Sequence, residues 1–465
     1  MDHQNKSELF NKMNNPVFKR NDELGKDARK ILNAAIQAVD PYRCVLNTIR
    51  VDNNQLIIED QQISLDEFAR IFTIGFGKSA VLMAKGLIDI FGPRLDSAFV
   101  ITKDKKFLAA NGYHNKLIVK LGGHPVPSED SIDGTKALLN SLPPLKCNDL
   151  MLILISGGGS ALFTQPVDGV TLEDFQILTQ SLLKCGADIN EINTLRKHLD
   201  HVKGGRLAIK LKPAMVKTLI LSDVIGDPLD MIASGPTVPD PTTFCDALAI
   251  IEKYQIKQQV PSSIFKYLNK GRQGQIPETP KFGDISPKRV QNFLIGTNFI
   301  ALDAGRNYAE GLGYHTLILS SHLTGKTENV AEFLDGIIKT EMVNEKPVEN
   351  PWCLLFGGET TVTITGQGLG GRNQDLALKM VEKIKGTKEL LFVSFATDGD
   401  DGPTDAAGAV CDGLVFSDSE KIDGLNLYQH IADNDSYNFH KEVGGLIKTG
   451  STGTNVNDLI LIISK

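Results

Sequence analysis

The residues that could do chemistry gather in glycine-rich loops, because glycine lets backbone N–H groups approach a ligand closely. The first loop, IGFGKSA at 74–80, follows an apolar run and places Lys78 at a predicted helix N-terminus. A cation beside helix N–H groups suits an anionic ligand. A Walker A loop would need glycine at position 72, which is Phe72, so a P-loop is excluded. A tight turn with a solvated lysine is the alternative.

The second loop, ISGGGSAL at 155–162, directly follows the most apolar run of the chain. Three consecutive glycines leave a nest of N–H donors unshielded, and two serine hydroxyls flank it. A flexible turn rarely needs three glycines, so we favour an anion-binding function. The predicted substrate- or phosphate-binding residues here are Ser156, Gly157, Gly158, Gly159 and Ser160.

A cationic helix is predicted over 191–208, ending at a glycine pair. His198 and His201 lie on one face, but without a third ligand nearby a solvated face is favoured over a metal site. Lys203, at the glycine break, is the better candidate for an anion contact. In the next loop, 221–237, Asp223 follows a strand, where an unpaired carboxylate is expensive unless it is hydrated or partnered. This position favours a general base or a Mg²⁺ contact.

The densest cluster lies in the second half, where Glu359 stands beside a glycine pair and TGQGLGGRNQD covers 365–375. This segment satisfies G-x-G-x-x-G, so dinucleotide binding is an alternative. The acid that a dinucleotide fold needs about 20 residues later is lacking, because the next strand ends at Asp398, about 30 residues on. Arg372 suits bidentate binding of phosphate or carboxylate. We therefore predict an anion clamp containing Gly371, Arg372 and Asn373.

The acidic loop 396–408 contains four aspartates among glycines. No glutamate falls at the twelfth position after the first aspartate, so an EF-hand is excluded. Mg²⁺ takes one or two carboxylates together with phosphate oxygens and water. Asp398 and Glu359 are the candidate metal ligands, and an acidic solvated turn is the alternative. Anion-binding loops, cations and a metal-type loop together suit phosphoryl transfer, which depends on positioning and charge stabilisation.

The elements that must position these loops are short apolar strands alternating with helices. The runs include RIFTI, SAFVI, KLIVKL, LMLILI and KTLIL, then TLILSS, WCLLF, LFVSFA and LILIIS. Such alternation predicts βαβ units, and ligands bind at the carboxyl ends of parallel strands. The polar segment 271–289 is rich in Gly and Pro and is interpreted as a linker. The predicted domains are 24–270 and 290–465, each a mostly parallel sheet covered by helices.

Composition excludes several classes. The 465 residues carry a net charge of −7, which disfavours nucleic acid as a partner. Six cysteines without a C-x-x-C pair indicate reduced thiols rather than zinc or a disulfide framework. The first 20 residues contain no apolar signal segment, and the run at 150–155 is too short to span a membrane. The expected location is cytoplasmic, without a membrane partner.

Eight segments, in order from about residue 25 onward, resemble the glycerate type-2 kinase family, also labelled hydroxypyruvate reductase, whose C-terminal half is called MOFRL. They are GFGKSA, GGHPVPSEDS, SGGGSALF, NTLRKHLDHVKGGRLA, LSDVIGDPLDMIASGPTVPD, GGETTVTITGQGLGGRNQDLAL, ATDGDDGPTDAAGA and STGTNVNDL. The resemblance implies a Rossmann-like three-layer N-terminal domain, an α/β MOFRL domain and an active site in the cleft between them.

The resemblance also implies ATP- and Mg²⁺-dependent phosphorylation of D-glycerate, usually to 2-phosphoglycerate. The family's functional lysine and arginine fall on Lys78 and Arg372. We expect Asp223 to orient or deprotonate the glycerate hydroxyl, and Mg²⁺ to lie near Asp398 or Glu359. NAD(P)H-dependent reduction of hydroxypyruvate is the alternative. The hydroxyl that is phosphorylated and the formation of a homodimer are left open by the sequence.

Overall fold

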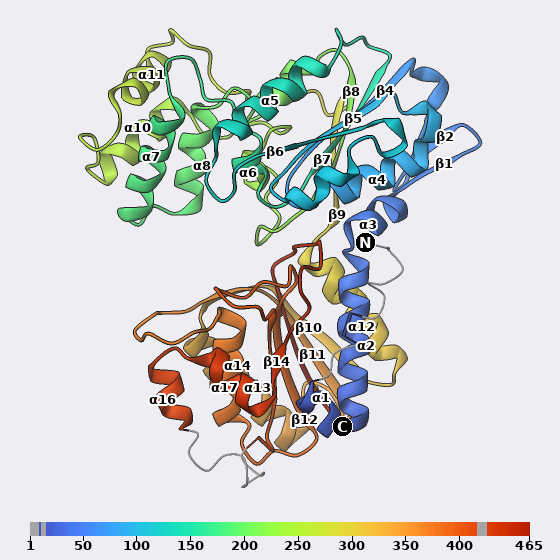
Figure 1. The fold of residues 1–465 in the computed structure, drawn as a ribbon, viewed down its shortest axis with the longest axis vertical. Coiled ribbons are helices and arrows are strands. Elements are labelled where there is room, and N and C mark those ends of the chain that lie inside the picture. The colour runs from blue at the N-terminus through green and yellow to red at the C-terminus, as the bar shows by residue number, and fades with distance from the viewer. Residues whose placement is uncertain (1–8, 11–14, 416–425) are drawn as a thin grey trace. The chain divides into compact units, whose positions relative to one another are not determined.

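The protein divides into two compact units (Figure 1). The computed structural model describes residues 9–10, 15–415 and 426–465. Unit 1 comprises Met1–Asp40 and Gly296–Lys465, and unit 2 comprises Pro41–Ile295. The predicted α/β fold of two domains is confirmed. Part of the N-terminal stretch in which no signal segment is predicted, 1–8 and 11–14, lies outside the described residues.

Unit 2 contains a six-stranded sheet with the order β6-β5-β4-β7-β8-β9. Its strands are β4 (Arg70–Phe76), β5 (Ser97–Thr102), β6 (Leu117–Leu121), β7 (Asp149–Ile155), β8 (Met215–Leu221) and β9 (Val290–Gly296). The pairs β4–β5, β4–β7, β5–β6 and β7–β8 are parallel, as predicted for this domain. In chain order this is the 3-2-1-4-5-6 arrangement of a Rossmann sheet, whose strand order reverses between β4 and β7. In sheets of this kind, ligands bind where the strand order reverses.

The helices of unit 2 form two groups around this sheet. They are α3 (Pro41–Thr48), α4 (Ala80–Phe91), α5 (Glu129–Ser141), α6 (Gly159–Leu162), α7 (Leu172–Lys184), α8 (Ile189–His198), α9 (Arg206–Lys210), α10 (Phe244–Lys253) and α11 (Ser262–Arg272). Helices α4 and α5 pack on the strands, whereas α7, α8, α10 and α11 gather to one side around their own apolar core (Figure 1). A small antiparallel sheet holds β1 (Ile49–Asp52), β2 (Gln55–Ile58) and β3 (Gln61–Ser64).

The sheet of unit 1 has the order β10-β11-β15-β12-β13-β14. Its strands are β10 (His315–Lys326), β11 (Trp352–Thr361), β12 (Leu390–Ala396), β13 (Gly408–Asp412), β14 (Leu446–Ile447) and β15 (Asp458–Ser464). Only β10 and β11 pair in parallel in the described part of this sheet, so the prediction of a mostly parallel sheet is wrong here. Strand β15 lies antiparallel between β11 and β12, and every residue in it is buried. A strand buried on both faces has a continuous apolar run whatever its direction.

The helices of unit 1 are α1 (Pro16–Arg20), α2 (Asp22–Ala38), α12 (Asn298–Gly311), α13 (Thr327–Asn344), α14 (Arg372–Lys383), α16 (Leu427–Ala432) and α17 (Ser436–Val443). The structure divides the chain differently from the predicted ranges 24–270 and 290–465. Residues 24–40 belong to unit 1, because the apolar face of α2 packs on α12. Strand β9 belongs to the sheet of unit 2, and the predicted linker 271–289 is part of that unit. In the described chain, no helix is long and apolar enough to cross a membrane.

Candidate functional site

Three predicted site segments meet at the carboxyl ends of neighbouring strands of unit 2. Lys78 follows β4, the loop 156–160 follows β7, and Asp223 follows β8. The first two loops are joined, because the Lys78 amide donates to the Gly157 carbonyl at 2.9 Å and the Ser79 amide donates to Ser156 Oγ at 3.0 Å. The topology thus places both glycine loops at the reversal of strand order.

Each of the three consecutive glycines lies against another side chain. A Cβ on Gly157 would be 2.1 Å from Asp223 Oδ2, and a Cβ on Gly158 would be 2.7 Å from His124 Cδ2. Gly158 also has a φ of 82°, which other residues rarely adopt. A Cβ on Gly159 would be 2.8 Å from the Cβ of Ala233. The glycines therefore permit close approach of the side chains around the loop, and they do more than confer flexibility.

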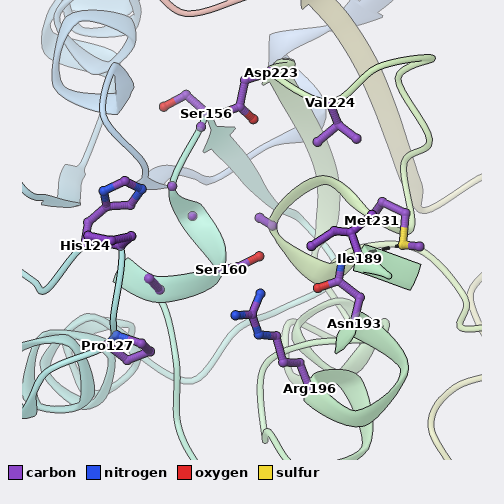
Figure 2. A pocket seen from close by; sticks show the side chains of 16 residues that line it. His124, Pro127, Ser156, Ser160, Ile189, Asn193, Arg196, Asp223, Val224 and Met231 are labelled. Carbon is purple, nitrogen blue, oxygen red and sulfur yellow. Dashed lines mark hydrogen bonds between the residues drawn. The ribbon is translucent and has the colours of Figure 1, made fainter. Parts of the chain in front are cut away.

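The loop forms one wall of a pocket of about 200 Å³ (Figure 2). This volume lies below the roughly 300–1,000 Å³ of sites for drug-sized ligands, so it suits a small metabolite. At the end of this loop, Ser160 Oγ and Ser234 Oγ are 2.9 Å apart, and Ser234 Oγ donates to Asn193 Oδ1 of α8 at 3.0 Å. The lining residues are His124, Pro125, Pro127, Ser156, Gly157, Gly158, Gly159, Ser160, Ala161, Ile189, Asn193, Arg196, Asp223, Val224, Met231 and Ala233.

His124 reaches the pocket from the loop after β6. Burial, together with the positive charges of Lys78 and Lys103, lowers the pKa of His124 to about 4. The imidazole is therefore neutral near pH 7. A neutral imidazole has one donor and one acceptor nitrogen, so His124 can exchange hydrogen bonds with a bound ligand without adding charge.

Arg196 brings a positive charge into the same pocket from α8. Burial lowers the pKa of its guanidinium, and no acidic group opposes this effect. Among the described residues, the guanidinium of Arg196 has neither a hydrogen-bond partner nor an ion-pair partner. An arginine stays protonated even so, because its ordinary pKa exceeds 12. The pocket therefore contains an uncompensated cation facing the glycine loop.

Lys203, which the sequence analysis selected as an anion contact, lies elsewhere. Its side chain is fully buried, its Nζ donates to the Phe163 carbonyl at 2.6 Å, and Asp200 lies 3.3 Å away. It does not line the pocket. Periodicity places both cations near one helix end, but only the docking of α8 decides that Arg196 enters the pocket and that Lys203 enters the core.

Buried ion pairs fix α8 on its other face. Lys197 Nζ lies 2.9 Å from Asp230 Oδ2 and 3.4 Å from Asp240 Oδ1. His198, predicted to lie on a solvated face, is instead buried; its Nδ1 faces the Thr194 carbonyl at 2.8 Å and its Nε2 faces Glu278 at 2.9 Å. These contacts hold the helix that positions the pocket's arginine.

Arg372, the other predicted catalytic cation, lies in unit 1 between two carboxylates. Its Nε and Nη2 donate to Asp458 at 2.6 and 2.9 Å, and its Nη1 lies 2.8 Å from Glu359 Oε1. Burial lowers the pKa of Arg372, but the hydrogen bonds and charge of Asp458 outweigh it and hold the pKa above its usual value. Burial raises the pKa of Asp458 to about 6, although Arg372 opposes the shift. A pocket of about 460 Å³ adjoins Arg372.

The predicted clamp residues Gly371 and Asn373 serve a protein carboxylate. The backbone amides of Asn373 and Gln374, at the start of α14, donate to Asp401 at 3.1 and 2.9 Å. A Cβ on Gly371 would lie 2.3 Å from the carboxyl carbon of Asp401. Asp401 therefore occupies the helix N-terminus that the sequence analysis assigned to phosphate, and burial raises the pKa of Asp401.

The glycines of the literal dinucleotide fingerprint are also packed against the protein itself. A Cβ on Gly366 would lie 2.3 Å from the Asp433 backbone, and a Cβ on Gly368 would lie 2.5 Å from Asp435 Cβ. The strand before this loop, β11, pairs in parallel with β10 on one side and antiparallel with β15 on the other, unlike the all-parallel sheet of a dinucleotide fold. The pattern therefore serves chain packing here.

The two predicted metal ligands belong to unit 1. Glu359 Oε1 pairs with Arg372, and Glu359 Oε2 accepts a hydrogen bond from Asn457 at 3.1 Å. Asp398 Oδ1 accepts the Asp400 amide at 3.1 Å. Within the described ranges, no group of three or more His, Cys, Asp or Glu residues has the arrangement of a metal site. These residues fit a Mg²⁺ ion that a nucleotide brings with it, and they do not fit one held by protein ligands alone.

Three residues with hydrogen-bonding side chains that line the pocket were not predicted from the sequence: His124, Asn193 and Arg196. His124 stands in GGHP after a strand, so its position at a carboxyl strand end was a usable signal. Asn193 and Arg196 are three residues apart on α8 and therefore share one face. That spacing was visible in the sequence, but the direction of the face was not.

Comparison with known protein families finds one match in each half of the chain. Residues 27–269 match a domain of unknown function (DUF4147), and residues 352–458 match the MOFRL family. A glycerate 2-kinase of Pyrococcus horikoshii is 42% identical over 438 residues, which cover 93% of this chain and 96% of the relative. A D-glycerate 2-kinase of Thermotoga maritima is 40% identical over 440 residues, which cover 95% and 98%.

A solved structure agrees with these sequence relatives. The crystal structure of a glycerate kinase from Thermotoga maritima has a TM-score of 0.83 and 39% sequence identity. The alignment covers 95% of this chain and 99% of that chain. The similarity therefore extends over nearly all of the chain, including the segments that form the pocket and the surroundings of Arg372.

Proposed function

The chain belongs to the glycerate kinase family, and on that premise we propose that it transfers the γ-phosphoryl group of ATP to D-glycerate, giving 2-phosphoglycerate and ADP. The observation that supports this best is the pocket of unit 2. A carboxylate, Asp223, and a guanidinium, Arg196, line one small pocket together with the glycine loop. A small hydroxy acid offers a hydroxyl to the first and a carboxylate to the second.

In the proposed reaction, the substrate hydroxyl oxygen attacks the γ-phosphorus of ATP as the bond to the β-phosphate breaks. Asp223 orients the hydroxyl and takes its proton. The amides of the loop 156–160 donate to oxygens of the substrate or the transferring group. Lys78, whose charge already lowers the pKa of His124, neutralises negative charge at the same strand ends.

Unit 1 is proposed to act on the nucleotide. Ion pairs with Asp458 and Glu359 fix the position of the Arg372 guanidinium. The adjoining pocket of about 460 Å³ supports binding of a larger ligand there. Gly371 and Asn373 contribute by fixing Asp401 and the start of α14. Mg²⁺, held by Asp398 or Glu359 together with phosphate oxygens, would neutralise charge on the phosphates.

One coupled assay tests the function. ADP release is measured with D-glycerate and ATP, and NADH and NADPH oxidation is measured in parallel with hydroxypyruvate. We expect ADP release that depends on D-glycerate, with NMR identifying 2-phosphoglycerate as the product. Oxidation of either cofactor without ADP release would refute the kinase in favour of a reductase. The filled space around Gly366 and Gly368 already argues against a dinucleotide there.

The proposal also covers the cellular compartment and the oligomeric state of the protein. All six cysteines are free thiols, which supports a reducing compartment such as the cytoplasm. A homodimer is also proposed, and light scattering coupled to size-exclusion chromatography would measure its mass against that of the 50.7 kDa chain. A mass equal to one chain at assay concentration would refute the dimer.

A further inference from the structure

We infer that Arg196 is the residue that recognises the carboxylate of the substrate and so selects a hydroxy acid over an uncharged polyol or amide. The identity of the acid rests on the proposed function, but the recognition of a carboxylate rests on the pocket itself. Arg196 is a binding and specificity residue in this assignment. It takes no part in proton transfer.

The first support is a contrast among neighbouring cations. Around α8 and α9, the other buried or half-buried cations have protein partners. Lys197 pairs with Asp230, Lys203 pairs with Asp200, and Arg206 donates to the Lys197 and Asp200 carbonyls at 2.8 and 2.6 Å. Within the part of the chain that the structure describes, Arg196 has none of these contacts. Arg196 is half-buried, and a charge that is withdrawn from water without a partner is expensive, so its retention points to a ligand.

The second support is the direction of the side chain. In Figure 2 the guanidinium of Arg196 points from α8 toward Ser160 and the glycine loop, with Asn193 beside it. The neighbouring hydroxyls of Ser160 and Ser234 already bond to each other. The Arg196 guanidinium is therefore the strongest side-chain donor at this end of the pocket. A guanidinium presents a planar fork of N–H groups, which matches the two oxygens of a carboxylate.

The third support is the charge arrangement across the pocket. Asp223 lies over Gly157, at the opposite side from α8 (Figure 2). A ligand carboxylate is repelled by Asp223 and attracted by Arg196, so only one orientation of a hydroxy acid satisfies both groups. That orientation directs the carboxylate to Arg196 and the hydroxyl end to Asp223. The same residue therefore determines both selectivity and the direction in which the substrate lies.

A substrate-binding Arg196 and a purely structural Arg196 differ in how their replacement changes thermal stability and affinity. Because the half-buried Arg196 guanidinium is partly desolvated and has no ion-pair partner among the described residues, the apolar substitution Arg196→Met removes an unfavourable burial. The substrate-free variant should therefore be at least as thermally stable as the wild type. At the same time it should bind D-glycerate about 10- to 100-fold more weakly, which is the effect expected for hydrogen bonds to a charged group.

The experiment measures D-glycerate binding by calorimetry without ATP, and KM and kcat by ADP release, for the full chain and its variants. Arg289→Met is the matched control, because Arg289 also has a pKa lowered by burial but donates to the Ala208 and Ala214 carbonyls outside the pocket. The control should lose thermal stability and keep its affinity for D-glycerate. Glyceramide serves as the uncharged analogue, and the preference for the acid over glyceramide should collapse only in Arg196→Met.

The outcomes separate the two proposals. Unchanged affinity and acid-over-amide preference in folded Arg196→Met would overturn the assignment of Arg196, while ADP release would still support the kinase. A marked fall in thermal stability with unchanged affinity would show a structural role and would also overturn it. Wild-type binding of D-glycerate that Arg196→Met loses, without any ADP release, would support the carboxylate site and refute the kinase. A wild type that binds no D-glycerate would overturn both.

Discussion

Replacing Gly157 with alanine tests the proposed position of Asp223 without altering any charge. The new methyl carbon would lie 2.1 Å from Asp223 Oδ2 and 2.7 Å from its Cγ. Unbonded heavy atoms rest at about 3.5 Å, so the carboxylate must move by more than about 1 Å. A displacement of about 1 Å at a reacting group lowers turnover by about 100-fold, or about 2.7 kcal/mol of barrier. We expect that loss in kcat.

The fold should survive the same substitution. The clash involves the end of one side chain at the pocket wall, and the backbone of Gly157 does not adopt a positive φ. Overpacking of this kind costs about 1 kcal/mol of unfolding free energy at its lower end. Gly134→Ala is the matched control in α5, because its Cβ would lie 3.5 Å from Ile101, an ordinary contact. It should stabilise the helix by about 0.5–1 kcal/mol and leave kcat unchanged.

The assay is ADP release at saturating ATP and D-glycerate, with unfolding in urea followed in parallel. Asp223→Asn provides the comparison, because both variants disturb the same carboxylate by different routes. Full kcat in a folded Gly157→Ala protein would refute the reasoning that Asp223 must lie against the glycine loop for reaction. A loss of stability as large as the loss of activity would show that the loop serves folding instead.

The remaining predictions concern charge and titration. Lys78→Ala and Arg372→Ala should each lower kcat by orders of magnitude while circular dichroism shows an intact fold, and near-normal activity would remove that residue from the mechanism. Asp458, whose pKa rises from 3.8 to about 6 on folding, contributes stability that is present below pH 3.8 and lost as the pH rises through 6. Wild type should thus lose roughly 3 kcal/mol relative to Asp458→Asn across that window in urea unfolding, and a pH-independent difference would contradict this. His124, with a pKa of about 4, should give no limb between pH 5 and 8 in kcat/KM, whereas a limb that disappears in His124→Gln would show that it titrates there.

The sequence predicted the parts of the fold that local pattern determines. Apolar runs followed by glycine loops located the strand ends, and the ordered motifs predicted the glycerate kinase family, which is confirmed. Strand direction in unit 1 was predicted wrongly, because the buried run of β15 has no marker of its antiparallel pairing. The domain limits differ from the structure because α2 pairs with a helix more than 250 positions later.

The candidate site was predictable where it depends on neighbouring residues in the chain. Lys78 and the loop around Gly157 follow from spacing alone. The partners of Arg372 do not, because Asp458 is 86 positions away and reaches it only through the pairing of β11 with β15. The same limit applies to Arg196, whose direction depends on how α8 docks. Long-range packing decides which charges are neutralised and which remain available to a ligand.

The division of the chain also determines which of the two units is completely synthesised first. Unit 2 is continuous, so its core is complete once residue 295 has been synthesised, and domains generally fold as units during translation. Unit 1 includes the early helices α1 and α2 but cannot be completed before β15, which lies between β11 and β12 in its sheet. Strand β15 also contributes Asp458. The ion pairs of Arg372 can therefore form only after residue 458 has been synthesised, when the pocket around Asp223 already has all its residues.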